Sequence, residues 1–129
     1  MKIREKSPAR EYRVGRTHPI VIRDCGALEL DPDEQVTFVT AKGAEYDVAR
    51  KTWGFYATPS TNGRLPTFGL RTALVKNDEG RFYVMLVERG NEVEFERYLG
   101  DEANRVIAWL DDEPTLSKIE KALSTRTEV

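Results

Sequence analysis

Side chains suited to binding an anion gather between Arg50 and Arg64. The run RKTWGFYATPSTNGR holds three basic residues, three aromatic residues, two glycines and four Ser or Thr hydroxyls. A turn at Asn62–Gly63 would offer backbone N–H donors, and the guanidinium that follows can bind a phosphate or a carboxylate. This combination predicts a site for a small anionic ligand such as a sugar phosphate or a nucleotide.

The predicted site extends beyond this turn. Gly54 lies between two aromatic residues, and a glycine inside a strand often marks a close approach of backbone or ligand. The ligand-binding residues that we predict are Arg50, Tyr56, Asn62, Gly63, Arg64 and Arg71. The alternative is that TPSTNGRLP is only a surface loop between strands, since such loops are polar in any protein.

The single histidine and the single cysteine, His18 and Cys25, invite a nucleophile–base interpretation. Two residues seven positions apart on one straight strand point to opposite faces of the sheet, so these side chains would not meet. We therefore expect Cys25 to be a buried structural thiol and His18 to end its strand. The sequence identifies no catalytic residue.

Metal and cofactor motifs are not matched either. One histidine and one cysteine cannot supply the four nitrogen or sulfur ligands of a zinc site. Asp31 and Asp33 have the spacing that begins a calcium loop, but Val36 and Lys42 occupy its required glycine and glutamate positions. The glycine-rich nucleotide motifs are absent. We predict no metal site and no cofactor.

Length and composition describe a globular protein. A chain of 129 residues with 40% apolar and 33% charged residues fits one domain. A net charge of −2 argues against nucleic acid as a partner. One cysteine fits a reducing compartment, the N-terminus has no apolar signal region, and no run of about 20 apolar residues could span a membrane. We expect a cytoplasmic protein, and the sequence does not indicate its oligomeric state.

Charge is unevenly distributed along the chain. Residues 1–17 contain six basic and two acidic side chains, whereas residues 82–129 contain eleven acidic and six basic ones. We interpret residues 1–17 as a basic, flexible arm that pairs only at its end, and residues 18–129 as a single globular domain. The basic arm and the acidic C-terminal helices are alternative surfaces for a protein partner.

The clearest predicted hairpin covers residues 35–50. A three-residue loop at Ala41–Gly43 sets Thr40 opposite Ala44 and collects the apolar side chains on one face, which a two-residue loop would not do. Strand alternation after this hairpin predicts that Trp53 and Phe55 belong to the core, with Tyr56 beside Arg50.

A second hairpin is predicted at residues 68–88. Its run Phe82–Val87 is apolar without alternation, which favours a central strand buried on both faces. Helices are predicted at residues 91–100 and 115–123, the second with Thr115 as its N-cap. Residues 105–110 could be a strand or a helix, because periodicity does not separate the two at this length.

Strands followed by helices predict an α+β fold. We expect a mainly antiparallel curved sheet or open barrel of about six to seven strands, with one or two C-terminal helices. Three function classes follow. The first is an accessory protein that binds a small anionic ligand, the second a protein-interaction module, and the third a small enzyme whose acid and base are distant in sequence.

Overall fold

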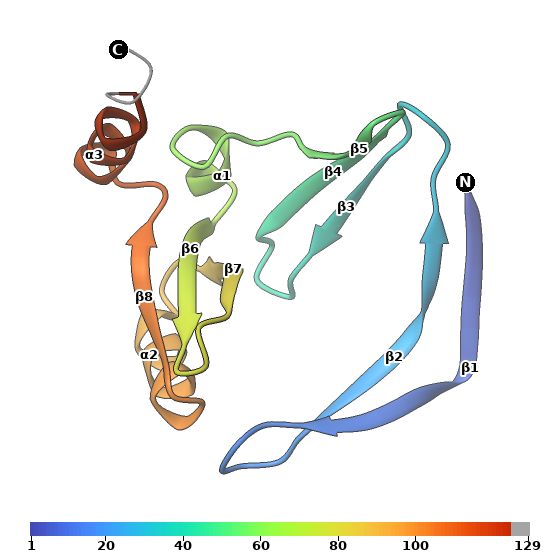
Figure 1. Cartoon of the computed structure of the whole chain (residues 1–129). Coiled ribbons are helices and arrows are strands. Elements are labelled where there is room, and N and C mark those ends of the chain that lie inside the picture. Colours follow the sequence, from blue (N-terminus) through green and yellow to red (C-terminus); the bar gives the residue numbers. More distant parts are fainter. Residues whose placement is uncertain (125–129) are drawn as a thin grey trace. The chain divides into compact units, whose positions relative to one another are not determined.

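The computed structural model of the protein describes residues 1–124 and has an α+β fold (Figure 1). Its strands are β1 (Lys2–Val14), β2 (Ile20–Glu29), β3 (Gln35–Val39), β4 (Glu45–Lys51), β5 (Gly54–Ala57), β6 (Leu70–Asn77), β7 (Phe82–Glu88) and β8 (Asn104–Trp109). Its helices are α1 (Arg64–Thr67), α2 (Glu92–Asp101) and α3 (Glu113–Ser124). The described strands form three antiparallel sheets and no closed barrel. The α+β class with an antiparallel arrangement and a C-terminal helix is confirmed.

The chain divides into two compact units. Unit 1 contains Met1–Phe38 and Asp47–Thr58, and unit 2 contains Val39–Tyr46 and Pro59–Val129. The division falls within the β3–β4 hairpin, whose tip belongs to unit 2. The prediction of a single domain over residues 18–129 is not tested by this division and stays a prediction.

In unit 1, residues predicted to form a loose arm are a strand. β1 pairs with β2 from Lys2↔Glu29 to Val14↔Ile20, and the register shifts between Glu5 and Arg10. The strands approach closely beside this bulge. A Cβ on Gly26 would lie 2.2 Å from the carbonyl oxygen of Arg4, and its φ of +143° also favours glycine. The arm is thus half of a two-stranded ribbon rather than a tail that pairs only at its end.

The predicted β3–β4 hairpin has the predicted loop. The Thr40 amide donates to the carbonyl oxygen of Ala44 at 3.0 Å, and Gly43 closes the loop with a φ of +94°. On one face of the hairpin the Thr37 hydroxyl donates to Asp47 at 2.6 Å. The three-residue loop and its register are therefore confirmed.

The prediction that Trp53 and Phe55 are core residues is wrong. Their exposed fractions are 70% and 64%. The alternation argument assumed one straight strand, but the chain reverses after Lys51, which pairs with Gly54 across a two-residue turn. β5 is consequently a separate strand at the edge of its sheet, and Trp53 lies at the tip of the hairpin.

In unit 2 the central strand is β6, not β7. The sheet order is β7-β6-β8, and Ala73 and Val75 of β6 are completely buried. The prediction that Phe82–Val87 is a central strand is wrong, because β7 is an edge strand in which Val84 is 67% exposed. An unbroken apolar run shows a preference for burial, but the number of neighbouring strands decides whether both faces are covered.

Two clusters form the core of unit 2. α2 places Leu99 against Ala73 and Val75, and its Phe95 ring meets the Trp109 ring edge to face at 5.8 Å. The second cluster consists of Ala44, Leu65 and Leu70, with Tyr46 and Leu86 packed against it.

The C-terminal elements show whether residues 105–110 are a strand or a helix. Residues 105–110 are largely strand, since β8 covers Asn104–Trp109. α3 begins at Glu113, so its N-cap is not Thr115 as predicted. Asp112 accepts hydrogen bonds from both the Thr115 amide and the Thr115 hydroxyl, which is the pattern of a capping carboxylate.

Candidate functional site

The six residues predicted to bind an anion are distributed over both units. Arg50 and Tyr56 belong to unit 1, whereas Asn62, Gly63, Arg64 and Arg71 belong to unit 2. Each group is therefore described by its own surroundings.

In unit 1, Arg50 and Tyr56 do not converge. Arg50 pairs with Phe55 across the β4–β5 ladder, and Tyr56 pairs with Ala49. Because adjacent residues on a strand alternate between faces, Tyr56 lies on the face opposite Arg50. The Arg50 guanidinium lies 5.8 Å from the Phe55 ring centroid and donates to the carbonyl oxygen of Gly54 at 3.3 Å.

In unit 2, the backbone donors of the predicted anion loop are used within the loop. The amides of Gly63 and Leu65 donate to the carbonyl oxygen of Ser60 at 3.3 and 3.1 Å. The Arg64 amide donates to the Ser60 hydroxyl at 3.3 Å. The Asn62 side-chain amide donates to Glu113 at 2.9 Å. The Arg64 guanidinium lies over the Phe68 ring, 5.3 Å from its centroid.

Arg71 is engaged by two carboxylates. Its guanidinium donates to both oxygens of Asp111, at 2.8 and 3.3 Å, and Glu92 lies 3.5 Å away. The hydrogen bond that Arg71 donates to Asp111 is the main reason that the pKa of Arg71 is raised. The same guanidinium stacks 4.0 Å from the Trp109 ring centroid. These contacts join the start of β6, the start of α2 and the turn after β8.

A different surface, not identified from the sequence, lies on the β1–β2 ribbon. Cross-strand partners share a face of a sheet, and successive residues alternate between faces. Three of the cross-strand pairs join apolar residues, and their members on β2 are an even number of positions apart, so all three lie on the same face. This ribbon apolar face consists of Ile3, Tyr12, Val14, Ile20, Ile22 and Leu28.

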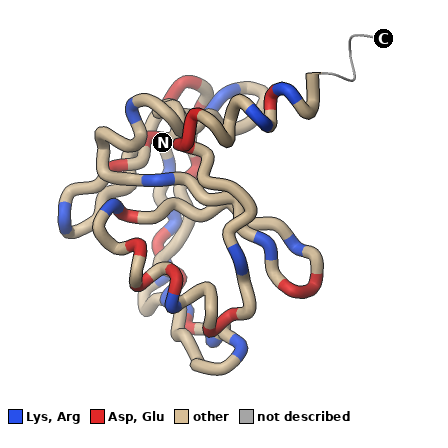
Figure 2. Tube along the Cα trace, turned by 90° about the vertical axis from the view of Figure 1, so that its left-hand side faces the viewer, with Lys and Arg blue, Asp and Glu red and all other residues tan. Residues whose placement is uncertain are grey.

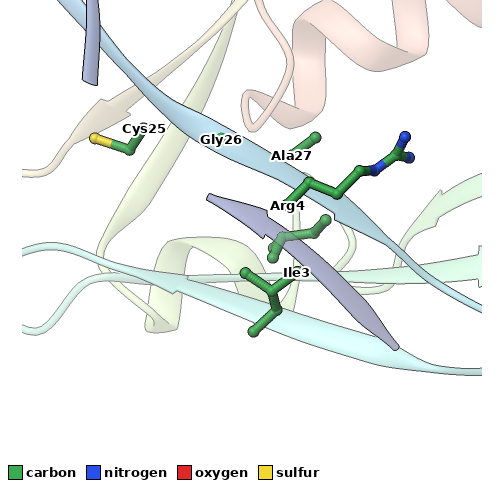
Figure 3. A pocket seen from close by; sticks show the side chains of 6 residues that line it. Ile3, Arg4, Cys25, Gly26 and Ala27 are labelled. Carbon is green, nitrogen blue, oxygen red and sulfur yellow. The ribbon is translucent and has the colours of Figure 1, made fainter. Parts of the chain in front are cut away.

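The opposite face of the ribbon is charged. Its pairs are Lys2↔Glu29, Arg4↔Ala27, Glu11↔Arg23 and Arg13↔Val21. Figure 3 shows the alternation directly, because the side chains of Ile3 and Arg4 extend to opposite sides of β1. The ribbon is therefore amphipathic over most of its length.

Most of the ribbon apolar face is open to solvent. Five of its six side chains, all except the half-buried Ile20, have exposed fractions between 37% and 60%. Contiguous exposed apolar patches above a few hundred Å² commonly mark interaction sites. The face is thus a candidate interaction surface of unit 1.

The middle of the same face is charged and internally paired. Asp24, which pairs with Arg10 across the ribbon, accepts a hydrogen bond from Lys6 at 2.5 Å. The Arg10 guanidinium lies 3.5 Å from the same carboxylate. The Lys6 hydrogen bond, followed by one from the Gly26 amide, lowers the pKa of Asp24. We call Glu5, Lys6, Arg10 and Asp24 the ribbon centre.

A shallow cavity of about 190 Å³ lies beside this centre (Figure 3). It is lined by Ile3, Arg4, Cys25, Gly26, Ala27 and Leu28. Cys25 is exposed, so the prediction of a buried thiol is wrong. The thiol is open to solvent because β2 belongs to a sheet of only two strands, and alternation places Cys25 on the charged face of this ribbon. A second cavity of about 280 Å³ lies in unit 2 between β7 and α2.

The sequence contains a strand pattern for this ribbon, although the basic composition of residues 1–17 favours a solvated arm. Tyr12 and Val14 flank Arg13, which is the alternation of a half-buried strand, and Ile20–Ile22 is a short β-branched apolar run typical of a strand. The six basic residues of the segment favoured a solvated arm instead. Figure 2 shows that basic and acidic positions are interspersed along the described trace, so charge alone does not separate the elements.

No family model, curated protein or solved structure matches this chain. Among residues 1–124, no group of three or more His, Cys, Asp or Glu side chains is placed to hold a metal ion. The helices of the same range are all too short or too polar to cross a membrane.

Proposed function

We propose that this protein is a non-catalytic interaction module that binds a protein partner through the ribbon apolar face. One observation carries the proposal, namely the segregation of three apolar cross-strand pairs onto one face of the ribbon, where five of the six side chains are exposed. A strand pair with only a structural role needs no such segregation unless something covers the apolar face.

The energetics of a two-stranded sheet support this proposal. Isolated two-stranded ribbons are at best marginally stable in water, and three or more strands with a covered apolar face are needed for independent stability. Complete burial of a Val, Leu or Ile side chain contributes roughly 1.5–3 kcal/mol relative to exposure. A partner that covers the face would therefore gain affinity and stabilise the ribbon together.

The acidic helix α2 is a less suitable docking element. Its apolar side chains Phe95 and Leu99 already pack on the β6 sheet, which leaves Val93 as the exposed apolar residue of its first turn. The anion-binding alternative has less support, because the Ser60–Leu65 loop uses its amides internally and Arg71 is paired with Asp111.

Site-specific photo-cross-linking in cells tests the proposal. Benzoylphenylalanine at Tyr12, on the ribbon apolar face, should give a covalent adduct with a protein after irradiation. The same probe at Arg13, one residue away on the charged face, is the matched control and should give little or none. Mass spectrometry of the adduct identifies the partner. Equal adducts at both positions, or none at either, would contradict the proposal.

A further inference from the structure

We infer that the partner of the ribbon apolar face is a second copy of this chain, with the two ribbons packed face to face about a two-fold axis. The inference rests on the proposed function, because it names the occupant of the same surface. The evidence for a second copy is the distribution of charged and apolar side chains along that face.

The apolar side chains form a patch at each end of the ribbon. Tyr12, Val14, Ile20 and Ile22 lie near the turn, and Ile3 and Leu28 lie near the free ends of the strands. The ribbon centre lies between these two patches. A two-fold axis that lies in the plane of the interface and passes through the ribbon centre places the two centres opposite each other. The apolar patches of one copy then face the apolar patches of the other, whether the axis runs along the strands or across them.

The ribbon centre is self-complementary in charge. It contains two cations, Lys6 and Arg10, and two anions, Glu5 and Asp24. A second copy therefore brings to the axis as many positive as negative groups, so the paired centres meet without an excess of either charge. A partner surface of a single sign would leave two of the four charges opposed by like charge, which disfavours binding.

The dimensions of the ribbon suit a dimer interface. β1 has 13 residues, and at about 3.3 Å per residue the ribbon is on the order of 40 Å long. Two such faces would stack about 10 Å apart as a four-stranded sandwich. Two strands are about 10 Å wide, so each face has a projected area of roughly 400 Å². This is below the roughly 800 Å² per partner of a stable complex and fits a weak, reversible dimer. Symmetric two-fold dimers are also the commonest soluble oligomers.

Sedimentation velocity on the full chain, from about 1 µM to about 1 mM, tests the inference. We expect the wild type to associate reversibly to twice the chain mass. Ile22→Asp, on the ribbon apolar face, should raise the dimer dissociation constant at least tenfold. Val21→Asp, on the opposite face, is the matched control and should change it less than threefold. Circular dichroism checks that both variants keep their strands.

A charge exchange keeps the test decisive if Ile22→Asp fails to fold. Lys6→Glu with Arg10→Glu makes the centre wholly acidic, and Glu5→Lys with Asp24→Lys makes it wholly basic. Each double variant alone should be monomeric, whereas a mixture of the two should form a heterodimer. Only a second copy of the ribbon on the other side of the interface predicts this rescue.

The outcomes separate the two proposals. A wild type that is monomeric throughout, or a mixture without heterodimer, overturns the inference. If the probe at Tyr12 then cross-links to another protein, the proposed function still holds. A third outcome is that the wild type and Ile22→Asp are both monomeric, Ile22→Asp has the lower melting temperature, and the probe at Tyr12 gives no intermolecular adduct. In that case the ribbon apolar face packs within its own chain. Both proposals then fail.

Discussion

The Arg71 guanidinium lies between a ring and a carboxylate: it stacks 4.0 Å from the Trp109 ring centroid while it donates two hydrogen bonds to Asp111. The ring is on β8 and the arginine is on β6, so the contact crosses the sheet from its central strand to an edge. Glu92 at the start of α2 completes the arrangement at 3.5 Å. Arg71 thus joins β6, β8 and α2 of unit 2.

Replacing Arg71 should destabilise unit 2. Arg71→Ala removes a planar cation that is stacked on a ring and bonded to a carboxylate, and leaves Asp111 without that donor. Hydrogen bonds to charged groups contribute roughly 1.5–3 kcal/mol, so we expect a loss of about 2 kcal/mol in the free energy of unfolding measured with urea. Arg71→Lys should recover only part of it, because lysine cannot bond both carboxylate oxygens in parallel.

The control for this prediction is Arg105→Ala, an exposed arginine on β8 of the same unit. Surface substitutions usually change stability by less than about 0.5 kcal/mol. Equal losses for Arg71→Ala and Arg105→Ala would show that the stacked arrangement contributes nothing beyond an ordinary surface charge.

The sheet of unit 2 gives a matched pair of burial tests. Val75→Asp should abolish folding, because the side chain is completely buried on β6 and an aspartate there would be an unpaired buried charge. Val84→Asp on the edge strand β7 should fold, since Val84 is 67% exposed. Far-ultraviolet circular dichroism and thermal melting compare the two variants. An unfolded Val84→Asp protein would show that β7 is covered on both faces.

β6 and β7 also show which features of the fold the sequence predicts. Local features were predictable, because the loop at Gly43, the strand β7 and the helix α2 depend on nearby residues and turn chemistry. Whether β7 is central or at an edge depends on which distant strand pairs with β6, and that strand proved to be β8. One sequence carries no information on such pairing, so the hairpin at residues 68–88 is predicted correctly while the central place of Phe82–Val87 in the sheet is not.

The candidate site was harder to predict for the same reason. The charge of Arg71 favours an anion site, but the carboxylate that pairs with it is Asp111, forty positions later in the chain. Tyr56 was placed beside Arg50 by alternation, and the turn at Thr52–Trp53 reversed that relation. The ribbon was missed because residues 1–17 look polar until β2 is laid against them and the two strands are considered as one surface.

Acid should destabilise the protein. The pKa values of Glu34, Glu92 and Asp112 are lowered in the folded state, chiefly by hydrogen bonds from the backbone or, for Asp112, from the Thr115 hydroxyl. A lowered folded-state pKa means that the unfolded chain binds more protons, so stability rises with pH through this range. The free energy of unfolding should be nearly constant between about pH 5 and pH 7 and decrease as pH falls through 4.5 and 3.8, the ordinary values for these groups.

Urea denaturation between pH 3 and pH 7 measures this dependence. Asp112→Asn removes one of the contributing carboxylates while it keeps an acceptor for the Thr115 amide. It should therefore flatten the slope below about pH 4.5 without loss of the helix cap. An unchanged slope in this variant would mean that Asp112 titrates alike in the folded and unfolded states.

The Cys25 thiol should react readily in the native protein. Cys25 is exposed on β2, and alternation places it on the charged face of the ribbon, away from the ribbon apolar face. Titration with a chromogenic disulfide should modify one thiol per chain without prior unfolding, at a rate within about tenfold of that in urea. If association covers the other face, as inferred, the rate should not change with protein concentration. A thiol that reacts only after denaturation would restore the buried assignment.

The anion-binding hypothesis for Asn62–Arg64 makes a separate prediction. An anion held by the loop amides would have to displace the hydrogen bonds that Gly63, Arg64 and Leu65 donate to Ser60. We therefore expect nucleotides, sugar phosphates and carboxylates to raise the melting temperature of wild type and Arg64→Ala equally or not at all. A rise in the wild type that Arg64→Ala loses and Arg64→Lys partly keeps would establish the loop as a ligand site, since a hydrogen bond to a charged group contributes roughly 1.5–3 kcal/mol.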